Sequence, residues 1–345
     1  MKKARIGVNG MGRIGKNILR VIAEKFNDSV EIVAGNDLFS ADEIAKAFVR
    51  DSIYGRFPVP IEAVSENQIK LGRHLVTVYT EKDAVNIPWG KHEVDVVFEC
   101  TRFYLTKEKS QAHLDAGAKK VILSAPAKDN TKVVVVGVNH DSLREDDVII
   151  SNASCTTNCY APMTLAIDKS IPIISGLMCT THAATSEQKI ADTFGGVKNR
   201  SLLNNILPVS TGAAKAVGKV LPHLNGKLNA TALRVPVNTG SVVEAVYLLE
   251  GERTTDKIVQ VLHTNIPVIN ESTLMKQVLY FGDDYECSAD CIGSPYSSMI
   301  TRNILTVPAG GNTLAKLTSF YDNEMGYSHR MVELALIMNN YKDLI

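Results

Sequence analysis

A glycine-rich segment near the start of the chain, residues 10–15, constrains the fold more than any other feature. Its glycines are Gly10, Gly12 and Gly15, and it follows a β-forming run, Ala4–Asn9. Apolar residues at helical spacing come next and would face a sheet: Ile14, Ile18, Val21 and Ile22. In this context the glycines permit a tight turn, close approach of the backbone to a pyrophosphate, and close helix–strand packing. The segment therefore predicts a βαβ unit that binds a dinucleotide.

An acidic residue, Asp37, lies 22 residues beyond Gly15 and follows a second predicted strand, Glu31–Ala34. A carboxylate at this position can accept hydrogen bonds from a ribose diol and would repel a 2′-phosphate. The sequence therefore favours NAD over NADP. The alternative is a glycine-rich turn that only joins a strand to a helix, with Asp37 as a loop or cap residue. The register of strand, glycines, helix and acid favours the cofactor site.

The remaining elements indicate two domains, because 345 residues exceed what one hydrophobic core usually holds. Four further short strands alternate with helical patterns and predict a parallel sheet: Val94–Cys100, Lys120–Ser124, Lys132–Val138 and Val148–Ser151. Long alternating runs follow and predict antiparallel strands: Ile173–Thr181, Leu228–Val235, Ser241–Leu249 and Leu314–Tyr321. A last helix is expected over Gly326–Tyr341, capped by Asp322 or Asn323 and packed on the first domain.

The expected fold class is thus α/β. A Rossmann NAD-binding domain spans residues 1–154 and is completed by the C-terminal helix, residues 323–345. An α+β catalytic domain with a mainly antiparallel sheet spans residues 155–322.

Charge and cysteine content restrict the partners and the compartment. The 37 basic and 37 acidic residues cancel, which argues against binding to nucleic acid or to an anionic membrane surface. No apolar run has the length of a membrane span or of a signal peptide core. Six cysteines are too few for a disulfide scaffold, so we expect reduced thiols and a cytoplasmic protein.

One of these thiols, Cys155, is the candidate nucleophile. It lies where a strand ends at Ser151 and a helix is expected to start near Thr156, so the helix dipole should lower its pKa. Cys159, one turn later, is expected to pack. His182 ends an alternating strand 27 residues downstream of Cys155 and can serve as its base.

A cysteine–histidine pair beside a dinucleotide indicates oxidation of an aldehyde through a thioester, which a second nucleophile then releases. The alternatives are a buried, inert Cys155, a metal site and a redox disulfide. The pairs Cys155/Cys159 and Cys287/Cys291 lack C-x-x-C spacing, and His182 is the only histidine near either pair in sequence.

Several segments together follow the pattern of one known family: residues 9–15, 36–38, 51–55, 151–159, 210–218, 233–236 and 321–327. On these segments the chain resembles phosphorylating glyceraldehyde-3-phosphate dehydrogenases over nearly its whole length. The resemblance implies oxidation of glyceraldehyde 3-phosphate to 1,3-bisphosphoglycerate with NAD, a homotetramer, and inorganic phosphate as second nucleophile. In such a tetramer the segment near Gly195 to Asn205 would line a neighbour's cofactor site.

The resemblance also implies roles for individual residues. Cys155 matches the nucleophile and His182 the acid/base. The positions that match the site of the attacking phosphate are Ser154, Thr156, Thr211 and Gly212, and those that match the site of the substrate phosphate are Thr185 and Arg234. The cofactor positions, besides the three glycines and Asp37, are Arg13, Ile14, Lys82, Thr101, Ser124 and Asn323, the last of which would orient the carboxamide. The ordinary alternatives are a surface ion pair for Arg234 and a helix cap for Thr211.

Several residues depart from the family pattern. Glu187 replaces a threonine and would repel a substrate phosphate. The segment between His182 and Thr211 is a few residues shorter, and the usual phosphate-site arginine there corresponds to Lys198 or Arg200. Arg102, Lys82 and Met325 replace a glycine, an arginine and a tryptophan respectively. These changes keep two alternatives open: a dehydrogenase of another phosphosugar aldehyde, such as erythrose 4-phosphate, with hydrolytic release of the thioester, and a binding or regulatory homologue without enzyme activity.

Overall fold

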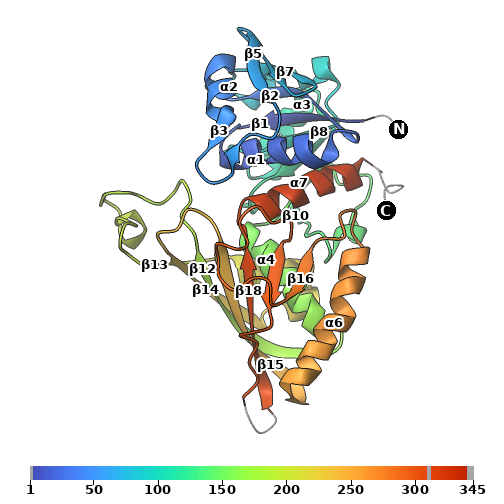
Figure 1. Cartoon of the computed structure of the whole chain (residues 1–345). Helices are drawn as coiled ribbons and strands as arrows, with labels where there is room; N and C mark the ends of the chain where they lie inside the picture. The colour runs from blue at the N-terminus through green and yellow to red at the C-terminus, as the bar shows by residue number, and fades with distance from the viewer. Residues whose placement is uncertain (1–2, 309–311, 340–345) are drawn as a thin grey trace. The chain divides into compact units, whose positions relative to one another are not determined.

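The computed structural model describes residues 3–308 and 312–339, which form two compact units (Figure 1). Among the described residues, unit one comprises 3–134, the segment Asp141–Ala153 and 328–339. Unit two comprises Val135–His140 and Ser154–Tyr327. Each unit is built around its own sheet.

Unit one contains a nine-stranded sheet in the order β10-β11-β9-β8-β1-β2-β7-β6-β5. The seven strands from β10 to β7 are parallel to their neighbours, whereas β6 and β5 add an antiparallel edge. The strands are β1 (Ala4–Asn9), β2 (Val30–Asn36), β5 (Ile61–Ser65), β6 (Gln68–Leu71), β7 (His74–Tyr79), β8 (Val96–Glu99), β9 (Lys120–Leu123), β10 (Lys132–Val133) and β11 (Ile149–Ser151). The short strands β3 (Arg50–Asp51) and β4 (Gly55–Arg56) pair separately.

Helices connect the parallel strands of unit one, as the sequence pattern predicts. Those that lie between successive strands include α1 (Arg13–Val21), α2 (Ala41–Val49) and α3 (Lys107–Asp115), and a 3-10 turn, η3 (Trp89–His92), precedes β8. The central strand β1 pairs with β2 on one side and β8 on the other, and its Ile6 and Val8 are fully buried. A strand buried on both faces reads as an apolar run, which explains why it is recognisable in the sequence.

The predicted strand Lys132–Val138 is wrong in its extent, because only Lys132–Val133 forms a strand. The backbone turns immediately afterwards: Val135 N–H donates to the Asn139 side chain at 2.8 Å, and the Val138 and Asn139 amides donate to the Val135 carbonyl. The apolar run suggests a longer strand, but these local hydrogen bonds divert the backbone from the sheet.

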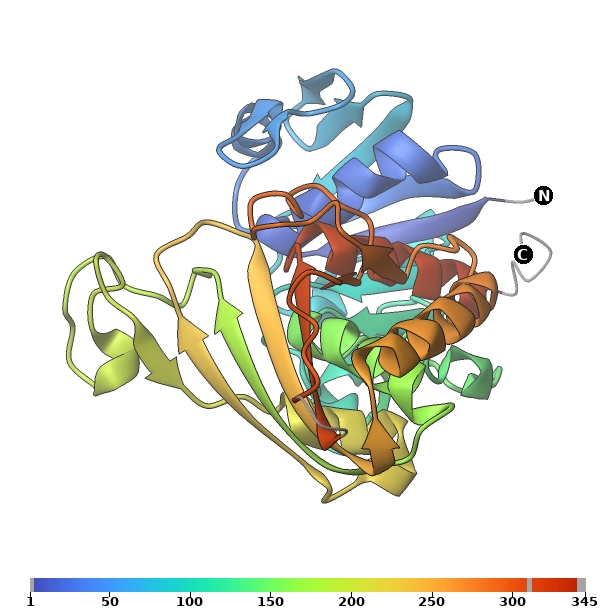
Figure 2. The ribbon, with the colours of Figure 1, turned by 60° about the horizontal axis from the view of Figure 1, so that its bottom comes forward.

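Unit two contains a seven-stranded sheet in the order β13-β14-β12-β15-β18-β17-β16. Four of its six neighbouring pairs are antiparallel, as expected, and β12/β14 and β16/β17 are parallel. Figure 2 shows the long strands β12 (green), β15 (orange) and β18 (red) side by side. The strands are β12 (Ile173–His182), β13 (Leu207–Val209), β14 (Leu228–Arg234), β15 (Ser241–Arg253), β16 (Leu279–Gly282), β17 (Ser298–Thr301) and β18 (Asn312–Tyr321).

The long helices that accompany this sheet in the described part of unit two are α4 (Cys155–Asp168), α5 (Ala213–Val220) and α6 (Thr255–Glu271). Along β15, Val243, Ala245, Tyr247 and Leu249 are fully buried at alternating positions, so one face of the strand meets the core. The ring of Tyr247 stacks on Tyr160 of α4, with ring centroids 6.3 Å apart. The helix that begins at Cys155 is thus anchored to the central sheet.

The last helix, α7 (Met325–Met338), has the predicted cap at Asp322. The Asp322 carboxylate accepts hydrogen bonds from the Glu324 and Met325 amides at 2.9 Å. From Ser328 the helix belongs to unit one, where the Lys120 ammonium donates to the Met338 carbonyl. The predicted end at Tyr341 lies outside the described residues. None of the helices in the described parts of the chain is long and apolar enough to cross a membrane.

Candidate active site

The glycine-rich loop of unit one connects β1 to α1. Gly10 has a φ of +90°, and a Cβ there would lie 3.0 Å from the Cys100 carbonyl carbon. A Cβ on Gly15 would lie 2.1 Å from the Gly10 oxygen, so only glycine allows this helix–strand contact. Gly12, by contrast, faces open space and caps α1 without a side-chain hydrogen bond. An uncapped helix N-terminus beside an open cradle fits the pyrophosphate of a dinucleotide.

The Asp37 carboxylate lies beside this loop. One oxygen accepts a hydrogen bond from the Met11 amide at 2.7 Å, and the other accepts one from the Leu38 amide at 2.7 Å. These bonds orient a carboxylate that retains lone pairs for a ribose diol. Glycine loop and acid therefore meet as the spacing predicts.

Other predicted cofactor positions surround the same strand ends. A Cβ on Gly10 would lie 3.0 Å from Thr101 Cγ2, so Thr101 packs against the loop. The Ser124 amide donates to the Glu99 carbonyl at 3.0 Å, whereas Lys82 is exposed. Ile14 lies in the first turn of α1 and is half-buried.

The Arg13 guanidinium is held by a residue to which the sequence patterns assign no role, Asp51. Arg13 donates to the buried Asp51 carboxylate, which also accepts hydrogen bonds from the Ile53 and Tyr54 amides at 2.9 and 3.1 Å. Burial alone would raise the pKa of this carboxyl, but these donors and the Arg13 charge hold it below its usual range. The only signal in the sequence is the place of Asp51 within the matching segment 51–55.

In unit two, the structure brings Cys155 and His182 together. Cys155 is the first residue of α4, and the Ser154 hydroxyl caps this helix by accepting a hydrogen bond from the Thr157 amide at 3.1 Å. His182 is the last residue of β12, and its Nε2 lies 3.3 Å from Cys155 Sγ. The thiol and the imidazole are thus in hydrogen-bond contact.

Arg234 also reaches His182, because β14 pairs with β12 in a register that places these two residues opposite each other. The Arg234 Nη1 lies 2.6 Å from His182 Nδ1 and 2.9 Å from the Ala183 carbonyl oxygen. His182 Nδ1 also lies 2.8 Å from that oxygen. A guanidinium only donates and a carbonyl only accepts, so Nδ1 cannot serve both partners at once.

One proton arrangement satisfies all of these groups. The two Nη1 hydrogens go to Nδ1 and to the Ala183 carbonyl, and the imidazole carries its own proton on Nε2. In this tautomer His182 donates a hydrogen bond toward Cys155 Sγ. For Nε2 to accept a proton, the guanidinium must leave Nδ1.

The expected depression of the Cys155 pKa is wrong. Burial raises the pKa of this thiol, and it outweighs the opposing effects of the Arg234 charge and of the Thr156 donors at the start of the helix. Burial and the Arg234 charge also lower the pKa of His182 to about 4. Both shifts favour the neutral thiol and the neutral imidazole, so the thiolate forms only when a proton is moved.

The remaining predicted phosphate positions form hydrogen bonds with other protein groups. The Thr156 hydroxyl contacts the Tyr321 hydroxyl at 2.9 Å, and Thr185 donates through its amide and hydroxyl to the Gln188 side chain. The Thr211 hydroxyl accepts a hydrogen bond from the Ala213 amide at 3.2 Å, close to a cap role, while Gly212 is the N-cap of α5.

The residues that depart from the family pattern are on the surface or in the core. Arg200 forms an exposed ion pair with Asp192 at 2.9 Å, and Glu187 is exposed. Met325 is buried, as a packing substitution would be.

The predicted cofactor residue Asn323 is held in place by hydrogen bonds. Its amide oxygen accepts them from Ser241 and Thr239 at 2.9 and 3.2 Å.

Tyr321 is a residue near the thiol for which the sequence offered no specific role. It is buried, its hydroxyl lies 2.9 Å from those of Thr156 and Thr180, and its ring meets the His182 ring edge-on at 5.9 Å. These contacts of Tyr321 therefore fix the positions of the imidazole ring and of the first turn of α4. Its only sequence signal is its place two residues before Asn323 in the matching segment 321–327.

A sheet of the dinucleotide-binding type and a cysteine–histidine pair on the same chain fit the class of NAD-dependent dehydrogenases, with Cys155 as the candidate nucleophile. Comparison with known proteins agrees with this class. Residues 4–107 match the family described as glyceraldehyde 3-phosphate dehydrogenase, NAD binding domain, and residues 154–323 match its C-terminal domain. The chain belongs to the glyceraldehyde-3-phosphate dehydrogenase family, and its cofactor is NAD.

Similar proteins come from distant organisms. Glyceraldehyde-3-phosphate dehydrogenase of Bacteroides fragilis is 42% identical over 342 residues, which cover 97% of this chain and 98% of the relative. Glyceraldehyde-3-phosphate dehydrogenase 4 of Caenorhabditis elegans is 43% identical over 343 residues, with the same coverage. The Streptomyces coelicolor enzyme is 39% identical over 339 residues, again covering 97% and 98%.

Proposed function

We propose that this chain catalyses the phosphorylating oxidation of glyceraldehyde 3-phosphate to 1,3-bisphosphoglycerate. The observation that carries the proposal is the 3.3 Å contact between Cys155 Sγ and His182 Nε2, in a chain whose other unit has the NAD-binding fold of the family. The relatives from Bacteroides fragilis and Caenorhabditis elegans are named for this activity, and the alignment covers 98% of each of them.

The residues of the chain would hold NAD in a defined way. Gly10, Gly12 and Gly15 would cradle the pyrophosphate, Asp37 would bind the adenosine ribose, and Asn323 would orient the carboxamide. NAD, when bound, supplies the acceptor for the hydride. The protein's own work is to supply the nucleophile, to move protons and to hold two phosphate groups.

Cys155 is the proposed nucleophile and His182 its acid/base. As the sulfur attacks the aldehyde carbon, Nε2 takes the thiol proton and then returns a proton to the carbonyl oxygen, which gives a hemithioacetal. After this oxygen has lost its proton to Nε2 and the carbon its hydride, a thioester remains on Cys155. Inorganic phosphate attacks its carbonyl carbon, the C–S bond breaks, the departing sulfur takes back the proton held on Nε2, and the acyl phosphate leaves.

Arg234 would bind the phosphate that the substrate already carries. In the structure its guanidinium donates a hydrogen bond to His182 Nδ1. A bound phosphate would draw the guanidinium away, so that Nδ1 can carry a proton and donate it to the Ala183 carbonyl at 2.8 Å. Nε2 would then present its lone pair to the thiol, which makes it competent as a base. Substrate binding and activation of the base are linked in this scheme.

A second candidate function is oxidation of another phosphosugar aldehyde with hydrolytic release. The Arg200–Asp192 ion pair favours it, because a guanidinium held by a carboxylate is a poorer site for an attacking phosphate. The exposed Glu187, two residues from Thr185, also favours a different substrate.

The domain limits, assembly and location complete the proposal. We assign residues 1–154 and 323–345 to the cofactor domain and residues 155–322 to the catalytic domain, in a homotetramer of the cytoplasm. Support comes from the family membership and from the sparse, unpaired cysteines.

The test follows NADH absorbance with glyceraldehyde 3-phosphate and NAD, with and without inorganic phosphate, beside a Cys155→Ser variant. Phosphate-dependent NADH formation that the variant lacks is the expected result, and trapping with hydroxylamine should reveal the acyl phosphate. Activity that is independent of phosphate would replace the main proposal by hydrolysis. Complete inactivity with both glyceraldehyde 3-phosphate and erythrose 4-phosphate would overturn both candidates in favour of a non-enzymatic homologue.

A further inference from the structure

A buried polar network lies directly beneath the cofactor-binding segments of unit one. Asn9 precedes Gly10, Asn36 precedes Asp37, and Glu81 precedes Lys82, while Glu99 lies two residues before Thr101. Three members are almost inaccessible, with 2% exposure for Asn9, 4% for Asn36 and 0% for Glu99. Each of these chain segments is therefore anchored, next to its predicted cofactor position, by a side chain or backbone group that belongs to this network.

The carboxylate of Glu99 is the centre of this network. One oxygen accepts hydrogen bonds from Asn9 Nδ2 at 2.6 Å and from His113 Nε2 at 3.0 Å. The other accepts hydrogen bonds from the Thr101 amide at 2.7 Å and from the Thr101 hydroxyl. All four partners act as donors, which is the arrangement a carboxylate needs when it is buried.

Asn36 extends the network to the next strand. Its Nδ2 donates to Asn9 Oδ1 at 2.8 Å and to the Glu81 carbonyl at 2.9 Å. Its Oδ1 accepts a hydrogen bond from the Glu81 amide at 2.9 Å. The carboxyl ends of β1, β2 and β8 and the segment that follows β7 are thereby joined through side chains, in addition to the sheet.

The other arm of the network leads to Trp89, the only tryptophan of the chain. The indole Nε1 donates to His113 Nδ1 at 3.1 Å. Because an indole only donates, Nδ1 accepts, and the neutral ring carries its proton on Nε2, which donates to Glu99.

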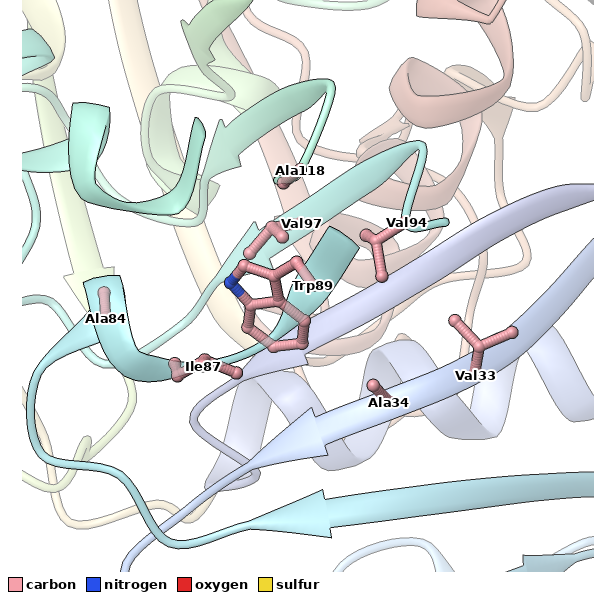
Figure 3. Packing of buried hydrophobic residues seen from close by; sticks show 8 residues of the cluster. All are labelled: Val33, Ala34, Ala84, Ile87, Trp89, Val94, Val97 and Ala118. Carbon is pink, nitrogen blue, oxygen red and sulfur yellow. The ribbon is translucent and has the colours of Figure 1, made fainter. Parts of the chain in front are cut away.

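Trp89 is also held by close apolar packing. It is completely buried and packs in the apolar cluster of Figure 3, among Val33, Ile87, Val94 and Val97. A Cβ on Gly7 would lie 2.8 Å from the indole ring. The indole therefore has little room to move, and a displacement of His113 would act on its hydrogen bond.

We propose that Glu99 is a positioning residue of the cofactor site, which holds Asn9 and Thr101 so that the glycine loop and the adenosine side keep their relative positions. A buried carboxylate without a cation partner is costly, and apolar packing would stabilise the fold as well, so a role in geometry accounts for its presence. Because His113 connects Glu99 to the indole, binding of a ligand at this site changes the environment of Trp89. The inference rests on the NAD site of the proposed function and not on its chemistry.

The experiment measures binding of ADP-ribose, which lacks the nicotinamide, by calorimetry and by the fluorescence of Trp89. Glu99→Gln replaces one acceptor by an NH2 group, so at least one of the four donors faces a donor. We expect ADP-ribose to bind about 10-fold or more weakly to Glu99→Gln, the loss of one charge-assisted hydrogen bond. The KM for NAD should rise in parallel, while kcat at saturating NAD and the alkylation rate of Cys155 stay within about 2-fold.

His74→Gln is the matched control. His74 is equally buried in unit one and also links two strands, since its Nδ1 accepts a hydrogen bond from the Ile32 amide at 3.3 Å, but it is the first residue of β7, at the amino end. This variant should lose thermal stability and bind ADP-ribose like the wild type. In the wild type ADP-ribose should change Trp89 emission, and His113→Gln, which breaks the link to Trp89, should abolish that response while binding persists.

The inference is overturned if Glu99→Gln binds ADP-ribose normally, or if His74→Gln loses binding to the same extent, since the network would then be merely structural. An unchanged Trp89 emission on binding to the wild type would overturn the proposed link to Trp89. If Glu99→Gln does not fold, Glu99→Asp keeps the charge, shortens the side chain, and should weaken ADP-ribose in the same way. Normal ADP-ribose results in a chain without dehydrogenase activity would refute the proposed function alone.

Discussion

Replacing Arg234 tests the proposed link between the substrate phosphate and the base. In the structure its guanidinium touches His182 Nδ1 at 2.6 Å and the Ala183 carbonyl at 2.9 Å. Arg234→Leu removes the charge, and with it both the proposed phosphate contact and the block on Nδ1. Arg234→Lys retains the charge without the bidentate geometry.

The magnitude follows from the type of bond lost. A hydrogen bond between charged groups contributes about 1.5–3 kcal/mol, which corresponds to about 10- to 150-fold in kcat/KM. We expect this loss for glyceraldehyde 3-phosphate with Arg234→Leu and an intermediate loss with Arg234→Lys. For glyceraldehyde, which has no phosphate to draw the guanidinium away, kcat/KM should not fall and should rise in Arg234→Leu, since only the variant frees His182 Nδ1.

The assay is the initial rate of NADH formation with both aldehydes, for the wild type and the two variants. The ratio of the two kcat/KM values isolates the phosphate contact from general damage to the site. An equal loss with both aldehydes would refute the reasoning, because Arg234 would then act through His182 and not on the phosphate.

Four further outcomes are expected. In His182→Gln, kcat should fall by about 10²- to 10⁴-fold, the usual share of a general base, with KM for NAD unchanged in initial-rate measurements. In Asp37→Ser, the ratio of kcat/KM with NADP to that with NAD should rise by about 10-fold or more, because a carboxylate no longer repels the 2′-phosphate. Since burial raises the pKa of Cys155, its alkylation by iodoacetamide should still be accelerating at pH values where a free thiol has levelled off. Asp51→Asn should lower the free energy of unfolding at neutral pH by about 1.5–3 kcal/mol in urea titrations. Because the folded pKa of Asp51 lies below its unfolded value, its stabilisation is present above about pH 4 and disappears as the pH falls further.

Each of these outcomes has a clear contradiction. A His182→Gln variant with normal kcat would remove the histidine from the mechanism, and unchanged NADP use in Asp37→Ser would separate the acid from the ribose. Alkylation of Cys155 that levels off near neutral pH would mean that a preformed thiolate exists. An Asp51→Asn variant as stable as the wild type at neutral pH would leave the Arg13 contact without an energetic role.

Much of the fold and part of the site follow from local patterns in the sequence. The β1 strand, Ala4–Asn9, has the predicted ends, and β12 and β14 differ from prediction by a single residue at one end. The glycine motif places its loop and Asp37 together, and Cys155 and His182 meet as expected. These predictions succeed because helix and strand periods, turn residues and the strand–loop–helix motif are encoded over short distances in the chain.

The tertiary structure alone decided what surrounds these residues. The contact of Arg234 with His182 depends on the pairing of β12 with β14, and the direction of the Cys155 pKa depends on burial, which the helix start by itself does not specify. The network around Glu99 joins residues up to 90 positions apart in the chain. Sequence patterns report periodicity and local backbone preference, whereas proton positions, pKa shifts and buried hydrogen bonds depend on groups that meet only when distant strands pack together.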